Sequence, residues 1–190
     1  MDIVKLFSDL PILETQRVSL RKINLFDTQD VFEYASDQKV SRYLLWDTHK
    51  STITTRKFII NIMQNYLDGK EAPWGIEYKE NSKIIGTIGF NYWDVTNKKA
   101  EVGYVLSSKY WNAGLMTEIL QMIVNFGITE LMLNRIEAKC DPLNVASQKV
   151  LGKTGFKYEG LLRKYVSANG EYKDIMLFSL IASDLLNKQI

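Results

Sequence analysis

The sequence predicts one continuous α/β domain that includes three consecutive antiparallel strands. Short segments in which apolar and polar residues alternate, as in strands, are interspersed with longer segments whose apolar residues recur every three or four positions, as in helices. No linker, internal repeat or low-complexity tract separates these segments. The chain has 190 residues, 46% of them hydrophobic, which is enough for one sizeable core. We therefore expect residues 1–190 to form a single domain.

The first third of the chain predicts a strand followed by two helices. Residues 15–23 alternate apolar and polar side chains, as expected of an opening strand. Asp27 is a typical N-cap for a short helix over residues 28–35. A longer helix is expected over residues 52–67, where apolar residues form one stripe and Gly69 follows the end.

The middle of the chain predicts three consecutive antiparallel strands. Residues 74–78 and 83–92 have the composition of strands, and the polar residues 80–82 between them suit a hairpin connection. Asn97 then turns the chain into a strand that begins at Lys99.

The last third predicts a helix, a strand, a second helix and a hairpin. A helix begins near Leu115, a strand covers residues 135–140, and a helix follows over residues 144–153. Residues 156–180 contain two apolar runs separated by the turn residues 167–170, which is typical of a hairpin.

The junction at residues 99–118 favours an anionic ligand. A strand runs there into a turn that contains Gly114 and opens a helix. The first backbone N–H groups of a helix have no intrahelical partner, and the helix dipole adds positive potential, so a phosphate can bind without a basic side chain. Gly114 allows the backbone to approach such a ligand closely.

Charge and cysteine content exclude several classes of protein. The 24 Lys and Arg residues against 22 Asp and Glu residues give a net charge of only +2, so nothing indicates a nucleic-acid partner. The one cysteine, Cys140, excludes an internal disulfide framework, and the N-terminus has no signal-peptide pattern. No apolar run is long enough for a membrane helix. We expect a cytoplasmic protein without a membrane partner.

Several motifs resemble those of a known family. The sequences LETQRVSLRKI at 13–23, KIIGTIGF at 83–90 and NKKAEVGYVLSSKYWNAGLMTE at 97–118 resemble the opening strand, central meander and pyrophosphate loop of the GNAT superfamily of acyl-CoA-dependent N-acyltransferases. NRIEAKCDPLNVASQKVLGKTGF at 134–156 is similar to the second half of its cofactor site. Within the superfamily, the chain resembles the branch that includes the ribosomal-protein N-terminal acetyltransferases. The resemblance implies the GNAT fold, in which a mixed, mostly antiparallel central sheet of about seven strands is splayed in the middle and flanked by helices.

The resemblance also implies which residues hold the cosubstrate, acetyl-CoA. The family loop Q/R-x-x-G-x-G/A corresponds to residues 111–116, where Trp111 stands first and Met116 replaces a small residue. The second motif has the family spacing N-x-x-S-x-x-x-L-x-x-x-G-F. The implied cofactor-binding residues are Tyr104, Val105, Leu106, Trp111, Asn112, Ala113, Gly114, Leu115, Met116, Thr117, Asn144, Ser147 and Lys153. Asn144 is also a favourable N-cap, and both roles can hold together.

Glu101 and Ser147 are the candidate catalytic residues. An amine attacks a thioester only as the free base, so Glu101 in the motif AEVGY is the expected general base. The alternatives are a solvated carboxylate or one paired with a lysine. By the resemblance, Ser147 hydrogen-bonds or protonates the departing CoA thiolate. Its alternative is a helical serine bonded back to a carbonyl.

The acceptor side is predicted less completely. By the resemblance it is formed near Trp46, Tyr92 and Trp93, although aromatic residues at strand ends are more often packed in the core. Cys140 is expected to be a buried structural thiol and His49 a surface loop residue. No set of ligands with workable spacing predicts a metal site.

The predicted activity is transfer of acetyl from acetyl-CoA to a primary amine by direct attack in a ternary complex. The acceptor is either a protein N-terminus, as in the ribosomal-protein branch, or a small-molecule amine such as a polyamine, amino acid or antibiotic. A non-catalytic acyl-CoA-binding domain is the competing class. The chain is expected to be a monomer or a homodimer.

Overall fold

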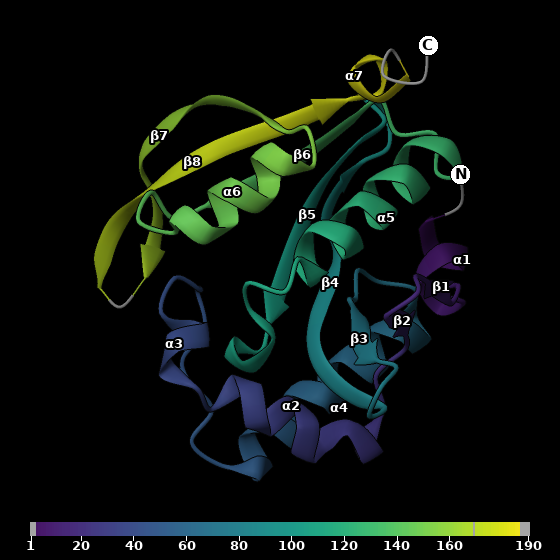
Figure 1. Ribbon diagram of the computed structural model, residues 1–190, viewed down its shortest axis with the longest axis vertical. Helices are drawn as coiled ribbons and strands as arrows, with labels where there is room; N and C mark the ends of the chain where they lie inside the picture. Colours follow the sequence, from purple (N-terminus) through teal and green to yellow (C-terminus); the bar gives the residue numbers. More distant parts are fainter. Residues whose placement is uncertain (1–2, 169, 187–190) are drawn as a thin grey trace.

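The computed structural model describes residues 3–168 and 170–186 (Figure 1). The helices are α1 (Ile3–Ser8), α2 (Thr28–Ala35), α3 (Gln38–Ser41), α4 (Thr52–Asp68), α5 (Leu115–Thr129), α6 (Val145–Lys153) and α7 (Ala182–Leu186), with 3₁₀ turns η1 (Leu25–Asp27) and η2 (Ser108–Tyr110). The strands are β1 (Leu13–Glu14), β2 (Val18–Arg21), β3 (Trp74–Tyr78), β4 (Lys83–Asp94), β5 (Lys99–Leu106), β6 (Arg135–Cys140), β7 (Lys157–Ala168) and β8 (Glu171–Ile181).

In the described part of the chain, eight strands form one sheet in the order β1-β2-β3-β4-β5-β6-β8-β7. Every neighbouring pair is antiparallel except β5 and β6, which are parallel. The mixed, mostly antiparallel sheet implied by the family resemblance is therefore confirmed. The count is eight rather than about seven, because the short strand β1 adds an edge to β2.

The sheet is splayed between β5 and β6. Their parallel register runs only from the pair Lys99 and Arg135 to the pair Glu101 and Glu137. Beyond these pairs the two strands separate, while β5 remains paired with β4 and β6 with β8 (Figure 1). The splay predicted by the family resemblance is present, and it leaves a gap in the middle of the sheet.

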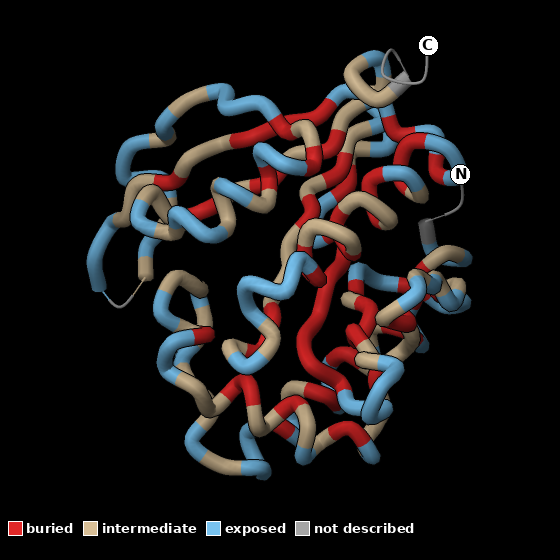
Figure 2. The backbone as a smooth tube through the Cα atoms, in the orientation of Figure 1, coloured by how far each residue is buried: buried red, intermediate tan, exposed pale blue. Residues whose placement is uncertain are grey.

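Helices α5 and α6 lie over one face of the sheet (Figure 1). Gly127 lets α5 approach closely, since an added Cβ would lie 2.9 Å from Ile136 Cδ1 and 3.1 Å from Phe90 Cζ. Helix α2 covers the opposite face, where Tyr34 contacts Thr87. Between these layers the centre of β4 is continuously buried from Ile84 to Phe90 (Figure 2).

Several predicted elements have the expected bounds. These are the helix over residues 28–35 and the strands over residues 74–78 and 135–140. The terminal hairpin is present as β7 and β8, although Asn169 in its predicted turn lies outside the described residues.

Two expectations at the N-terminal end were wrong. The opening strand is only Val18–Arg21, because the chain turns at Thr15, whose hydroxyl accepts hydrogen bonds from two backbone N–H groups, those of residues 17 and 18. Asp27 precedes α2 but its side chain does not cap that helix. Its carboxylate instead accepts hydrogen bonds from Arg21 at 2.8 and 2.9 Å and from the backbone N–H of Asn24 at 2.8 Å.

Among the described helices, none combines the length and apolar character needed to cross a bilayer.

Candidate active site

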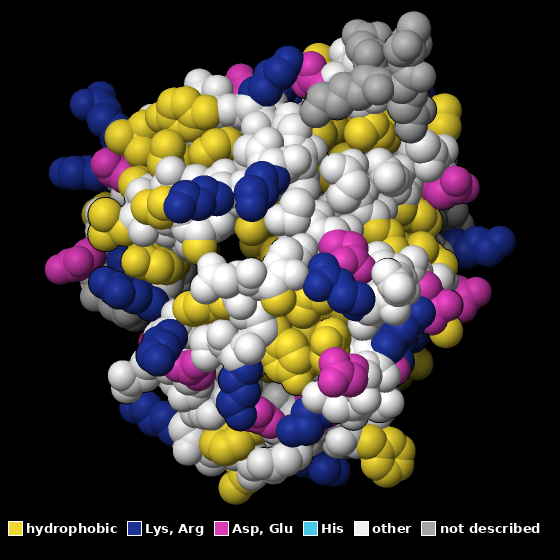
Figure 3. All heavy atoms as spheres, in the orientation of Figure 1, with side chains coloured by type: hydrophobic (Ala, Val, Ile, Leu, Met, Phe, Trp, Pro, Cys, Tyr) yellow, Lys and Arg dark blue, Asp and Glu magenta, His cyan; other side chains and the backbone are white. Residues whose placement is uncertain are grey.

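A cavity of about 370 Å³ lies where β5, the loop before α5, α6 and the segment around α3 converge. Figure 3 shows an opening through the molecule between α6 and the loop that precedes α5, with basic side chains on its α6 side. Twelve of the residues predicted to bind acetyl-CoA line the cavity: Tyr104, Val105, Leu106, Trp111, Asn112, Gly114, Leu115, Met116, Thr117, Asn144, Ser147 and Lys153. The structure thus brings together two motifs that are some 30 residues apart in the sequence.

The loop before α5 presents its backbone to the cavity. Asn112 and Gly114 both have positive φ angles, of 61° and 75°, and Gly114 occupies the N-cap position of α5. Residues 115–117, which form the start of α5, also line the cavity. Their N–H groups are those that a helix leaves without intrahelical partners. An anion is favoured at this point by both the donors and the helix dipole.

Arg17 holds this loop in place from the start of β2. Its Nη1 donates to the carbonyl oxygen of Ala113 at 2.9 Å, and its Nε donates to Glu118 Oε2 at 2.8 Å. Ala113 does not line the cavity, unlike its neighbours in the predicted set. Its carbonyl oxygen instead binds Arg17. Because Arg17 also binds Glu118 in the first turn of α5, it links the loop to the start of this helix.

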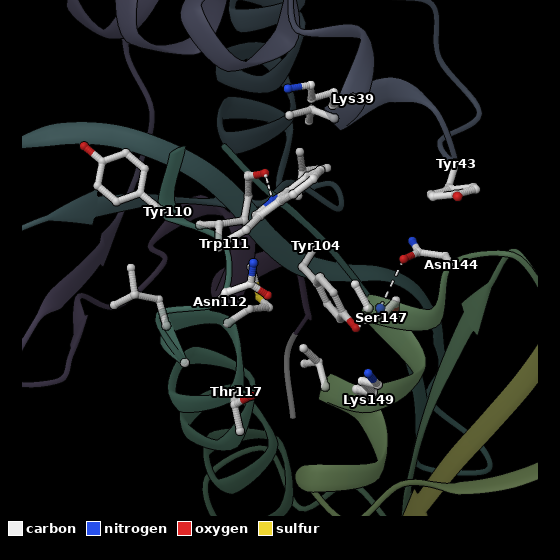
Figure 4. A pocket seen from close by; sticks show the side chains of 18 of the residues that line it. Lys39, Tyr43, Tyr104, Tyr110, Trp111, Asn112, Thr117, Asn144, Ser147 and Lys149 are labelled. Carbon is white, nitrogen blue, oxygen red and sulfur yellow. Dashed lines mark hydrogen bonds between the residues drawn. The ribbon is translucent and has the colours of Figure 1, made fainter. Parts of the chain in front are cut away.

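Residues 104–106, which are predicted to bind acetyl-CoA, can offer it backbone groups only where β6 does not pair with them. The β5–β6 register indeed stops before these residues. However, the indole Nε1 of Trp111 donates to the carbonyl oxygen of Leu106 at 2.9 Å. That one carbonyl already has a partner, because the Trp111 ring folds back over the end of β5 (Figure 4).

Asn144 and Ser147 of the α6 segment line the cavity together with Tyr104 of β5 (Figure 4). Asn144 Oδ1 accepts a hydrogen bond from the backbone N–H of Ser147 at 3.1 Å, so Asn144 caps α6 as the sequence allowed. The Ser147 hydroxyl lies 2.8 Å from the Tyr104 hydroxyl rather than bonding back to a helix carbonyl. Burial raises the pKa of Tyr104 above its ordinary value, so its hydroxyl stays protonated at neutral pH and can serve as a donor.

Three lysines line the cavity: Lys39 from α3, and Lys149 and Lys153 from α6. None of them forms an ion pair with another residue in the described ranges. Lys153 was predicted, whereas Lys149 was missed although its spacing of four residues places it on the same helix face. Lys39 and the nearby Tyr43 come from a part of the chain with no corresponding motif. These cations suit a polyanionic ligand.

Glu101 does not line the cavity and faces the other side of the sheet. Side chains alternate along β5, so Tyr104 points toward α6 and Glu101 points away from it. Glu101 Oε2 lies 2.7 Å from Lys139 Nζ. A carboxylate paired with a lysine is one of the alternatives that the sequence left open for this residue. Tyr92 is its register partner on β4, so the two side chains lie side by side on that face.

Trp46 and Trp93, which were predicted near the acceptor site, do not line the cavity. Trp93 is only 9% exposed and packs against Phe7 and Phe90, with ring centroids 6.0 and 5.0 Å apart. Trp46 packs against His49 at 5.4 Å. Both indoles pack against other aromatic rings, which is the more common use of such side chains.

Cys140 is expected to be unreactive toward a disulfide reagent such as DTNB in the folded protein. The residue is buried, and burial raises the pKa of its thiol to about 11. At about pH 8 only roughly one thiol in a thousand is then the reactive thiolate. Absorbance of the released thiol should rise slowly in the native protein and rapidly in denaturant. Rapid release of one equivalent from the native protein would contradict this assignment.

Among the residues that the structure describes, no group of three or more His, Cys, Asp or Glu side chains is arranged to hold a metal ion.

Several known proteins are similar to this chain in sequence. The family described as an acetyltransferase (GNAT) domain matches residues 17–157. An uncharacterized N-acetyltransferase, p20 of Bacillus licheniformis, is 39% identical over 169 residues, which cover 89% of this chain and 95% of the relative. A ribosomal-protein-serine acetyltransferase of Escherichia coli (strain K12) is 33% identical over 104 residues, covering 55% of this chain and 58% of that protein.

Solved structures share the fold. The structure of an acetyltransferase (GNAT family) from Bacillus anthracis superposes with a TM-score of 0.81 and 26% identity, and the match covers 91% of this chain and 99% of that one. Other solved structures of the same fold contain CoA or acetyl-CoA.

Proposed function

Because this chain belongs to the GNAT acetyltransferase family and uses acetyl-CoA as its cosubstrate, we propose that its acceptor is the α-amino group of a protein N-terminus. The amine attacks the thioester directly in a ternary complex. The residues of the cavity fit the cosubstrate, since the start of α5 and three lysines face the same space. Lys39, Lys149 and Lys153 and the backbone N–H groups at Gly114–Thr117 would hold its phosphates.

One observation carries the proposal of direct attack: the gap between β5 and β6 is flanked by different groups on its two faces. Tyr104 and Ser147 lie on the face that carries the cavity, and Glu101 lies on the opposite face. A thioester reaching the gap from one face and an amine from the other would meet without an intervening acyl-enzyme. The buried Cys140 thiol, with its raised pKa, is a poor nucleophile for such an intermediate.

In the proposed reaction, each group has one task. Glu101 removes a proton from the acceptor ammonium, directly or through water, so that the nitrogen lone pair can attack the carbonyl carbon. A C–N bond forms and the C–S bond breaks. Ser147, supported by the hydroxyl of Tyr104 at 2.8 Å, donates a hydrogen bond or a proton to the departing sulfur. The second proton, which the nitrogen loses as the amide forms, goes to the CoA sulfur or restores the Ser147 hydroxyl. The products are an acetylated amine and CoA.

Support for a protein N-terminus comes from the ribosomal-protein-serine acetyltransferase among the relatives. On the face that carries Glu101, its register partner Tyr92 is half exposed, so this face can be reached from solvent. A terminal ammonium on an extended peptide can approach Glu101 from that face while the rest of the peptide stays outside.

The experiment is a panel of acceptors incubated with acetyl-CoA, read by thiol release and by mass spectrometry. The panel contains peptides that begin with serine, alanine or methionine and also contain an internal lysine, the same peptides with blocked N-termini, and polyamines. We expect turnover of the free peptides with acetylation at the α-amine only. Turnover confined to polyamines, to blocked peptides or to reactions without any acceptor would refute the proposal.

A further inference from the structure

Two side-chain contacts cross the gap between β5 and β6, one on each face of the sheet. On the cavity face, Tyr104 of β5 reaches Ser147 of α6. On the opposite face, Lys139 of β6 reaches back to Glu101 of β5, with 2.7 Å between Nζ and Oε2. The last register pair of the two strands is Glu101 and Glu137, so Lys139 is the first β6 residue beyond the paired region that points to this face. Its side chain therefore spans the mouth of the gap.

The ammonium of Lys139 is held by three groups. Besides the Glu101 carboxylate, Nζ donates to the Tyr165 hydroxyl at 3.0 Å and lies 4.8 Å from the centroid of the Tyr165 ring. Burial lowers the pKa of Lys139, but the hydrogen bonds to Glu101 and Tyr165 outweigh it and raise the pKa above its ordinary value. A carboxylate, a hydroxyl and an aromatic face together form a site with the chemistry to bind an ammonium ion.

The backbone of β7 places Tyr165 in this position. The register between β7 and β8 is irregular between Leu162 and Val166. Within this irregularity Lys164 has a φ angle of 49°, and its N–H donates to Asp174 Oδ1 at 2.7 Å. Bulges of this kind redirect side chains and are frequent beside active sites. The redirected Tyr165 remains half exposed, so its ring can be reached from solvent.

We propose that Glu101 and Tyr165 form the binding site for the ammonium group of the acceptor, and that Lys139 occupies this site as an internal competitor until the acceptor displaces it. This inference rests on the proposed function only in that the acceptor is a primary amine. The site selects ammonium groups with at least two hydrogens to donate, one to the carboxylate and one to the Tyr165 hydroxyl. It therefore accepts primary amines and rejects tertiary and quaternary ones. Lys139 keeps the gap closed on this face while no acceptor is bound.

The first test is the kinetic effect of Lys139→Met, measured with a serine-initiated peptide amide. Removal of the competitor should lower KM for the peptide about fivefold, the factor that corresponds to an ion pair of about 1 kcal/mol, and leave kcat within about twofold. Lys139→Arg, which retains a cation, should keep the KM of the unmodified protein. A KM for Lys139→Met that is unchanged or raised would overturn the proposal.

The matched control is Lys99→Met. Lys99 lies on the same face and pairs with Glu137 at 3.7 Å, and its side chain is 29% exposed against 26% for Lys139. It lies at the paired end of the two strands and does not cross the gap. The KM of the Lys99→Met protein should equal that of the unmodified protein. An equal fall in KM for both variants would mean that removing any positive charge from this face suffices, which contradicts the proposal.

The second test needs no turnover. Lys139→Ala leaves a space matching the lysine side chain, so the probe is n-butylammonium chloride, with n-butanol as the neutral control. Binding is followed by chemical shifts of the aromatic side chains. We expect saturable binding of butylammonium to Lys139→Ala, and none to the unmodified protein or to Lys139→Ala/Glu101→Gln. Equal binding to all three proteins, or equal binding of butanol, would overturn the proposal.

The two tests also separate this inference from the proposed function. If no peptide is acetylated but butylammonium binds as expected, the protein N-terminus is the wrong acceptor and the ammonium site stands. If peptides are acetylated but butylammonium does not bind to Lys139→Ala, the acceptor is correct and the ammonium site is wrong.

Discussion

Replacing Gly114 with valine is expected to weaken CoA binding roughly 5- to 30-fold, which corresponds to about 1–2 kcal/mol. Gly114 has a φ angle of 75°, in the left-handed region that β-branched residues strongly disfavour. The expected loss arises from the backbone and not from a clash. An added Cβ would lie 3.9 Å from Arg17 Nη2, with no closer neighbour. Relief of the strain must turn the N–H groups at the start of α5 away from the ligand.

Two control variants make this prediction specific. Gly170→Val imposes the same kind of strain at a φ angle of 79°, in a hairpin where a Cβ would meet no atom within 4 Å and where the glycine does not line the cavity. Lys109→Ala removes a nearby positive charge that pairs with Glu33. Isothermal titration calorimetry with CoA should give near-normal affinity for both. A larger loss for Lys109→Ala than for Gly114→Val would show that side-chain charge, rather than backbone, dominates CoA binding.

Substitution of Glu101 by glutamine is expected to reduce turnover by roughly 10² or more while leaving CoA affinity unchanged. Glutamine keeps the shape of the side chain but cannot accept the proton of the acceptor ammonium. CoA affinity should be unaffected because Glu101 lies on the face opposite to the cavity. The measurements are initial rates at saturating acetyl-CoA and calorimetric titration with CoA.

Glu137→Gln is the matched control for this substitution. Glu137 is the register partner of Glu101, and its side chain is 15% exposed against 20% for Glu101. Glu137 pairs with Lys99 and Arg135 at the end of the gap where β5 and β6 are still paired. The turnover of the Glu137→Gln protein should therefore stay within a few-fold of that of the unmodified protein. If the Glu101→Gln protein has unchanged turnover, Glu101 is not the general base.

Much of the fold was predictable because long elements carry strong periodic signals. Helix α4 ends at Asp68, one residue beyond the predicted end, and the predicted stop residue Gly69 follows with a φ angle of 64°. Short elements carry no such signal. Helix α3 has four residues and strand β1 has two, so both depend on tertiary contacts rather than on local pattern.

The cosubstrate side of the site was predictable for the same reason, since its residues come from two contiguous motifs. The rest depends on contacts between distant segments. Lys39 reaches the cavity only because α3 is held against η2, where Asp37 accepts a hydrogen bond from Ser108. The contact between Tyr104 and Ser147 joins β5 to α6, and no spacing in either segment indicates it. The redirection of Tyr165 by the irregular register of β7 is equally invisible to sequence patterns.

The splay between β5 and β6 also has a consequence for folding cooperativity. The sheet consists of two halves, β1 to β5 and β6 to β8, which share a seam of only three residue pairs. A ligand that fills the seam supplies hydrogen bonds that the polypeptide itself leaves out. Its binding free energy is thereby added to the free energy that holds the halves together. Amides along the seam are the ones whose hydrogen exchange should depend most strongly on CoA, because local opening and ligand release are the same event there.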